Sequence, residues 1–214
     1  MRSFNLAALA LFCSFCFVET AAAVTLSFGS LSTAGNTYAA VGGNVNQSGF
    51  TVASVDNALY TWEASSANLP GLNTANTSLF EFYAGGTDTV NEGSGFFTAT
   101  SIDLAPVLAG GSGTFTVTFT GTHADSTTVT QSFTVSDGTP TELQTFDFTN
   151  FTNLVDLSFS QGTNSGFFGA QVTAYQFDNL VVTPGATLAS PEPTAVWLAV
   201  VGLIAVVGRK RAVG

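Results

Sequence analysis

The chain has 214 residues, enough for one domain plus targeting signals, and its formal net charge is −10 at pH 7. All four basic residues lie at the two ends of the chain, so no Lys or Arg occurs between Ser3 and Gly208. Because nucleic-acid affinity depends on Lys and Arg at the phosphates, this composition excludes a nucleic-acid-binding protein. The acidity is typical of a soluble extracellular surface, and divalent-cation binding is the alternative interpretation.

Residues 1–23 have the pattern of a secretory signal peptide. Arg2 supplies the positive charge, and residues 6–18 form the apolar segment, which we expect to be helical. Ala21 and Ala23 supply the small residues of a cleavage site. The pattern predicts an exported protein.

Residues 24–185 are predicted to form a single all-β domain. They are rich in Thr, Ser, Gly, Asn and Phe and contain few strong helix formers. Apolar and polar residues alternate clearly over 114–121 and again over 127–135, with a polar turn at 122–126 between them. This pattern predicts a β-hairpin.

Further strands are predicted from the same alternation. They cover residues 24–31, 49–53, 59–64, 78–84, 96–104, 142–149, 154–160 and 171–183. Turn-forming clusters lie at 84–88, 110–113, 136–140 and 162–166, and the segment 32–48 has no periodicity and is expected to be a loop. About ten short strands favour a jelly-roll-type β-sandwich, with a closed barrel as the alternative.

The C-terminal segment follows a short linker at residues 186–190 and consists of three parts. A Pro-Glu-Pro tripeptide comes first, an apolar run over 194–208 follows, and a basic cluster ends it. The tripeptide is Pro191, Glu192 and Pro193, and the cluster is Arg209, Lys210 and Arg211. Fifteen residues separate Pro193 from Arg209, fewer than the ~20 of a stable membrane-spanning helix. Residues 191–214 resemble a PEP-CTERM sorting signal, also catalogued as the ice-binding protein C-terminal domain.

This resemblance implies a destination more than an activity. Such tails form a short transmembrane helix that anchors the protein transiently, until an exosortase-type enzyme cuts near the Pro-Glu-Pro motif. Proteins with this signal accompany exopolysaccharide production. The resemblance therefore implies a cell-surface or extracellular matrix protein whose partners are the secretion machinery, the exosortase, the membrane and a polysaccharide. The catalogue name does not imply that this chain binds ice.

A second resemblance covers the body. The segments 101–105, 118–122 and 177–182 are similar to jelly-roll domains that look like carbohydrate-binding modules, whose last strand often carries an Asp-Asn pair near a structural calcium ion. The predicted metal site is therefore a calcium ion at Asp178 and Asn179. Asp56 and Glu81 are more distant candidate ligands, and Gly29 stands where relatives often have an acidic residue. The alternative interpretation is that Asp178 binds backbone at a β-bulge. No other cofactor is expected.

Few residues of the chain are suited to catalysis. Cys13 and Cys16 both lie in the signal peptide, and the single histidine, His123, lies in the predicted hairpin turn, where an exposed polar residue is usual. The clustered acids are Glu63, Glu81, Asp88 and Glu92, and their spacing singles out no pair that would serve a glycoside hydrolase. The sequence therefore predicts a protein that is not an enzyme.

Three aromatic residues are candidates for sugar binding. Tyr60, Trp62 and Tyr83 have the character needed for stacking on a sugar, and alternation puts Tyr60 and Trp62 on one face of a strand. The alternative interpretation places Trp62 in the core. The sequence thus predicts a structural or adhesive protein associated with exopolysaccharide, and the alternative is a carbohydrate-binding module that recognises a defined glycan.

Overall fold

The computed structural model describes eight segments of the chain. They are residues 21–32, 38–62, 77–81, 86–93, 95–106, 114–136, 143–161 and 175–185, all within one compact unit, Ala21–Gly185. The predicted linker and sorting signal and most of the signal peptide lie outside these segments. In the described segments, no helix is long and apolar enough to cross a membrane.

The described residues form thirteen strands and one short 3-10 helix, η2 (Gly29–Leu31). The strands are β1 (Val24–Leu26), β2 (Tyr38–Gly42), β3 (Asn44–Gln47), β4 (Phe50–Ser54), β5 (Leu59–Trp62), β6 (Ser78–Glu81), β7 (Thr87–Asn91), β8 (Phe97–Pro106), β9 (Thr114–His123), β10 (Thr128–Ser136), β11 (Gln144–Asp147), β12 (Leu154–Gln161) and β13 (Tyr175–Pro184). Every pairing between them is antiparallel.

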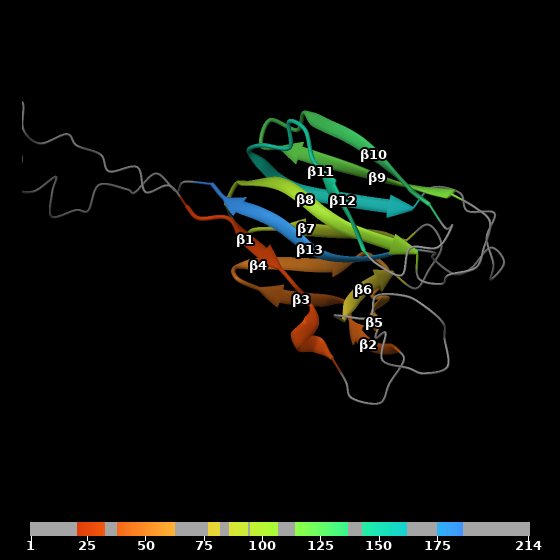
Figure 1. Cartoon of the computed structure of the whole chain (residues 1–214). Helices are drawn as coiled ribbons and strands as arrows, with labels where there is room; N and C mark the ends of the chain where they lie inside the picture. The colour runs from red at the N-terminus through yellow and green to blue at the C-terminus, as the bar shows by residue number, and fades with distance from the viewer. Residues whose placement is uncertain are drawn as a thin grey trace, which may run out of the picture. The chain divides into compact units, whose positions relative to one another are not determined.

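The strands are arranged in two layers (Figure 1). One layer has the order β10-β9-β12-β7-β4-β3, and the other has the order β11-β8-β13-β6-β5-β2, with β1 also paired to β13. A single residue pair, Leu154 with Phe97, connects the ladders of the two layers. This arrangement confirms the predicted all-β, jelly-roll-type sandwich.

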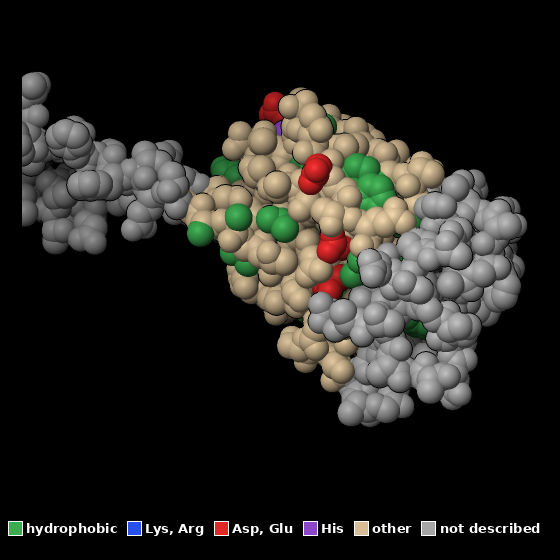
Figure 2. Space-filling view, viewed as in Figure 1, with side chains coloured by type: hydrophobic (Ala, Val, Ile, Leu, Met, Phe, Trp, Pro, Cys, Tyr) green, Lys and Arg blue, Asp and Glu red, His purple; other side chains and the backbone are tan. Residues whose placement is uncertain are grey.

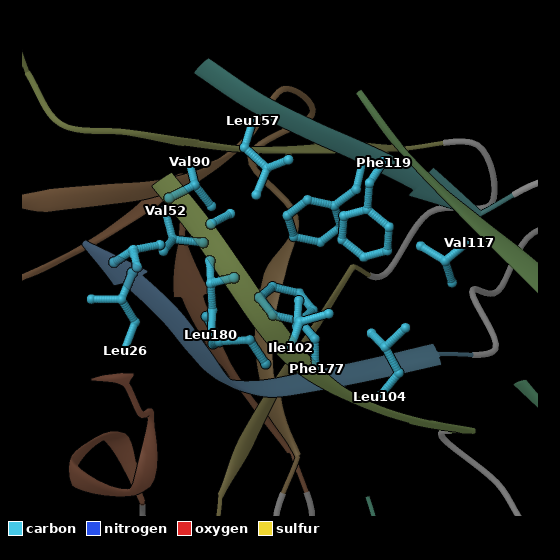
Figure 3. Packing of buried hydrophobic residues seen from close by; sticks show 14 of the residues in the cluster. Leu26, Val52, Val90, Ile102, Leu104, Val117, Phe119, Leu157, Phe177 and Leu180 are labelled. Atoms are coloured by element: carbon cyan, nitrogen blue, oxygen red, sulfur yellow. The ribbon is translucent and has the colours of Figure 1, made fainter. Parts of the chain in front are cut away.

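The core lies between the layers and is made of the apolar side chains that alternate along the strands. Figure 3 shows such side chains from both layers pointing into one shared space, among them Phe119 from β9 and Phe177 from β13. Phe159 connects these two rings, since it stacks on Phe119 at 4.9 Å between centroids and meets Phe177 edge-on at 5.0 Å. Burial of these aromatic rings supplies much of the area that stabilises the fold.

The predicted hairpin is confirmed, because β9 and β10 pair from Thr122 opposite Thr128 onward. The predicted loop over 32–48 is wrong, since it contains β2 and β3. β2 is the last strand of its layer and β3 the last of the other, and strands so short show little hydrophobic alternation. The predicted turn at 84–88 also overlaps β7, which begins at Thr87.

Candidate functional site

The described surface has an open groove of about 530 Å³ at one end of the sandwich. Three loops build it: the β7–β8 connection, the β9–β10 turn and the segment that precedes β12. Its lining consists of Phe96, His123, Ala124, Asp125, Thr127 and Asn153. We call this the Phe96 groove.

The β9–β10 turn forms one wall of the groove and is fixed by its own hydrogen bonds. The amide of His123 donates to the carbonyl oxygen of Thr127 at 2.9 Å, which closes the turn. Asp125 Oδ1 accepts the amide of Thr127 at 3.0 Å and its hydroxyl at 2.6 Å. These bonds, and secondarily the neighbouring His123, lower the pKa of Asp125, so its carboxylate is ionised at neutral pH.

The histidine ring also contacts a second wall. His123 Nδ1 lies 3.3 Å from the carbonyl oxygen of Asn153. Asn153 has a positive φ of 54°, a conformation that Asn tolerates better than most residues. The hydrogen bonds of both walls therefore hold the polar side of the groove in place.

Phe96 supplies the apolar side of the groove. Its side chain is 46% exposed, and Val55 is the other large hydrophobic side chain exposed in the described segments. The carbonyl oxygen of Phe96 accepts a hydrogen bond from the amide of Gly185, which follows the last strand. The backbone under the ring is thus tied to the end of β13, so the exposed ring sits on a fixed base.

The Phe96 groove is suited to binding and poorly suited to catalysis. A fixed, exposed aromatic face next to hydroxyl, amide and carboxylate groups can stack on the apolar face of a ligand and hydrogen-bond to its edge. The His123 ring contacts the backbone carbonyl oxygen of Asn153, and Asp125 is hydrogen-bonded to Thr127 within its own turn, which is not the arrangement of a catalytic triad.

Sequence reasoning did not identify this groove. The sequence presents His123 as an exposed polar residue of the hairpin turn, with a catalytic role as the alternative, and the predicted site residues do not include Phe96, Asp125, Thr127 or Asn153. One signal is present in the pair Phe96-Phe97, since a strand with one solvent-exposed side buries only one of two consecutive side chains. Phe97 is fully buried and Phe96 is exposed.

The predicted sugar-binding aromatics lie elsewhere, on β5. Tyr60 and Trp62 both contact the ring of Phe80 on β6, at centroid distances of 5.6 and 5.8 Å. Trp62 is only 7% exposed and Tyr60 is half-buried. Trp62 and Tyr60 therefore pack against Phe80 in this structure. Tyr83 lies outside the described residues.

Asp178 lies at an irregular point of β13, where the pairing with β8 shifts register. Its Oδ1 accepts the amide of Phe28 at 3.0 Å, and Asn179 Nδ2 donates to Asp103 Oδ2 at 2.8 Å. Burial raises the pKa of Asp178, and the amide of Phe28 opposes that rise. Among the described residues, no three acidic, His or Cys side chains are close enough to share a metal ion. Calcium takes six to eight oxygen ligands, so these residues alone do not complete a site, and calcium at Asp178 and Asn179 stays a prediction.

A second acidic group lies inside the sandwich. Asp88 on β7 and Glu81 on β6 are both fully buried, and the Tyr175 hydroxyl donates to Asp88 Oδ2 at 2.9 Å. Burial raises the pKa of Asp88 well above its ordinary value, and the neighbouring Glu81 carboxyl raises it further. A hydrolase needs its carboxyl pair in a cleft that substrate can enter, and these two carboxyls face the interior.

The predicted processing residues are described only in part. Ala21 and Ala23 directly precede β1, and Ala23 is exposed. The sorting residues Pro191, Glu192, Pro193, Arg209, Lys210 and Arg211 lie outside the described residues. The signal-peptide and sorting assignments therefore stay predictions.

Comparison with known proteins places the chain in no family. No protein-family model matches it, and no curated protein matches it. Among solved structures it is similar to a mutant of a carbohydrate-binding module of family 29, with 13% identity and a TM-score of 0.36 over 79% of this chain and 96% of that one. It is also similar to a DUF4465 family protein from Bacteroides ovatus, with 9% identity and a TM-score of 0.41 over 77% and 99%.

A third similar structure is the family 11 carbohydrate-binding module from Clostridium thermocellum, solved in complex with a beta-1,3-1,4-mixed-linked tetrasaccharide. The identity is 11% and the TM-score is 0.33, over 68% of this chain and 97% of that one. Similarity at this level assigns no ligand to this chain.

Proposed function

We propose that this chain is an exported, non-catalytic surface protein whose β-sandwich binds a neutral saccharide in the Phe96 groove. The observation that carries the proposal is the exposed ring of Phe96, which lies among hydrogen-bonding groups on a fixed base. Binding of this kind gives the protein an adhesive role towards an extracellular polysaccharide.

The chemistry of the groove favours a sugar over other small ligands. A pyranose ring has an apolar face that stacks on an aromatic ring and hydroxyl groups at its edge, which match Thr127, Asn153 and the ionised Asp125. A phosphate, sulfate or uronate group would be repelled by Asp125 and would find no Lys or Arg in the body. Figure 2 shows acidic side chains and no Lys or Arg on the described part of the face that it displays. The ligand is therefore a neutral sugar.

Delivery to the surface is the second part of the proposal. The A-x-A site at Ala21 and Ala23 and the tail over residues 191–214 support export, transient anchoring and cutting by an exosortase-type enzyme. In the host cell, replacing Pro191 and Pro193 by alanine should leave the sandwich folded and leave the uncut protein in the membrane fraction. Normal processing of this variant would contradict the sorting assignment.

The binding part is tested with soluble neutral oligosaccharides by isothermal titration calorimetry. Phe96→Ala should weaken binding about tenfold or more, which corresponds to about 1.4 kcal/mol, because an exposed aromatic anchor is removed. Val55→Ala is the matched control, since Val55 is 65% exposed and does not line the groove. Equal affinity of the Phe96→Ala variant and the wild type would reject the groove as the binding site.

A further inference from the structure

The outward side of the layer β10-β9-β12-β7-β4-β3 carries short polar side chains in register. Alternation along β9 points Val117 and Phe119 into the core, so the threonines between them point outward. The pairings continue this pattern from strand to strand. One row crosses all six strands: Thr130, Thr120, Ser158, Thr89, Ala53 and Asn44. We call this outward side the hydroxyl face.

A second row lies beside the first. It consists of Ser132, Thr118, Ser160 and Thr87, which oppose one another on β10, β9, β12 and β7. Neighbouring strands lie about 4.8 Å apart, so each row presents one short side chain at about that interval. The side chains are half-buried in the middle strands and exposed on β10 and β3, so the rows are accessible from outside.

Several of these hydroxyls are held in place by hydrogen bonds. Thr118 Oγ1 and Ser132 Oγ lie 3.0 Å apart across the hairpin, and Thr51 Oγ1 donates to Asn46 Oδ1 at 2.7 Å. Short side chains also lose much less rotamer entropy on contact than Lys, Glu or Gln. The hydroxyl face is therefore organised before any partner arrives.

The charge of this surface is unusual for an exposed sheet. Neither row contains a charged or an aromatic side chain. The carboxyl that borders the rows belongs to Asp156, opposite Thr122, and its pKa is raised by partial burial. A typical soluble domain is about 25% charged, whereas this chain is 8% charged. The two rows are therefore uncharged, and the chain as a whole is poor in charged residues.

We propose that the hydroxyl face is a contact surface for a neutral polysaccharide chain that lies across the strands. This inference rests on the proposed function in taking the partner to be a saccharide, but it uses side chains that do not line the Phe96 groove. A linear polymer lying across the strands along the first row meets a hydrogen-bonding side chain on every strand except β4, where Ala53 stands. The groove holds a short segment, and the face adds contacts that only a longer chain can reach.

Other partners fit the face less well. Protein interfaces are enriched in Tyr, Trp, Phe, Met and Arg at their centre, and the two rows contain none of these residues. Anionic lipids and anionic polymers are recognised through Lys and Arg, which the body lacks, and its carboxylates repel them. A neutral, hydroxyl-rich polymer is the partner that this surface attracts without a charge penalty.

The test measures adsorption of the purified protein to an insoluble neutral β-glucan, with soluble alginate as an anionic competitor. The variant Thr120→Val/Thr130→Val removes two hydroxyls of the first row with little change of shape. It should lower the bound fraction at least threefold. Thr25→Val/Thr100→Val is the matched control, because both residues are exposed on strands of the other layer, and it should adsorb like the wild type.

A second variant covers the case in which methyl contacts carry the binding. Thr120→Lys places a long side chain on the face and should also reduce adsorption. Adsorption of both face variants at the wild-type level, or competition by alginate, would overturn the inference. If Phe96→Ala alone loses oligosaccharide binding while the face variants adsorb normally, the groove stands and the face does not. If the wild type binds neither polymer nor oligosaccharide, both proposals fail.

Discussion

The two layers of the sandwich bury their strands in different ways. In the layer that carries the hydroxyl face, burial alternates strictly, as in β4 and β7, so one side of each strand packs and the other meets solvent. In the other layer all four residues of β6 are buried, and so are the first four of β13. This layer is covered on both sides where β6 and β13 pair.

This difference in burial determines in which layer a polar side chain lowers the stability of the fold. On the hydroxyl face the polar side chains keep access to water. In the other layer Ser78, Gln176 and Asp178 are fully buried although they are polar. Burying polar groups is tolerated only when they are hydrogen-bonded, and Ser78 Oγ does donate to Gln176 Oε1. Mutations should therefore cost much more in the covered layer than on the hydroxyl face.

The largest effect is expected for Phe177→Ala in β13. Phe177 is fully buried and its ring meets Phe28 and Phe159 edge-on at 5.9 and 5.0 Å. Truncation should lower the free energy of unfolding by about 3–5 kcal/mol, through lost burial and a cavity. Urea unfolding followed by fluorescence measures the change. Phe96→Ala, at an exposed ring, is the control and should cost far less; equal losses would contradict the burial assigned to Phe177.

The next effect concerns pH and the interior pair of Asp88 and Glu81. The folded-state pKa of Asp88 is raised above its unfolded value, so the folded state holds the proton more tightly. The stability gained is complete below the unfolded pKa and is lost as pH rises towards the folded pKa, by up to about 1.4 kcal/mol per pH unit for one proton. Urea unfolding between about pH 4 and about pH 8 should show this decline.

Asp88→Asn is the informative variant for this pH dependence. The amide does not titrate and still offers an oxygen to the Tyr175 hydroxyl, so the decline with pH should become shallower. Asp125 has the opposite effect on the pH dependence of stability, because the hydrogen bonds from Thr127 in the exposed turn lower its pKa. An unchanged pH profile in Asp88→Asn would show that the interior proton resides elsewhere.

A smaller loss is expected for Asp178→Ala. The substitution leaves the amide of Phe28 buried without the acceptor that Asp178 Oδ1 supplies, which costs about 1–3 kcal/mol. Asp178→Asn retains an oxygen acceptor and should cost less. Thermal and urea unfolding of both variants compare the two. If alanine and asparagine were equally mild, the hydrogen bond to Phe28 would contribute little to stability.

Most of the fold could be predicted from alternation, because the layer with one wet side follows the simple period-two rule. β9 and β10 are the clearest example. The rule failed where a strand is short and at an edge, as in β3, where only Val45 of four residues is buried. Alternation also could not show that Trp62 is buried, because the burial of this side chain depends on which residues cover its layer.

The candidate site was harder to predict because three loops distant in sequence build it. Phe96 and His123 are far apart along the chain, and Asn153 joins them only because Leu154 pairs with both β8 and the end of β9. No local sequence pattern predicts that these three residues lie close together in the fold. The buried acids Asp88 and Asp178 were likewise visible as residues, but their burial was not, since an acidic residue in an alternating strand is normally assumed to face water.

The smallest effect is expected on the hydroxyl face itself. Thr120→Val/Thr130→Val changes two outward side chains that oppose each other on β9 and β10, and both residue types favour strands. The free energy of unfolding should change by less than about 0.5 kcal/mol. Thr61→Val on β5 is the contrasting variant: Thr61 is 1% exposed and its hydroxyl donates to the carbonyl oxygen of Ala39 at 3.3 Å.

Loss of the Thr61 hydroxyl should cost about 1 kcal/mol, because it removes a hydrogen bond within the covered layer. Urea unfolding under identical conditions gives both values. If the double variant on the hydroxyl face were the more destabilised of the two, its hydroxyls would be contributing to folding. Their exposure in rows would then need no external partner to explain it. If the free energy of unfolding is nearly unchanged, the two threonines do not stabilise the fold, and the proposed contact with a polysaccharide accounts for their exposure in rows.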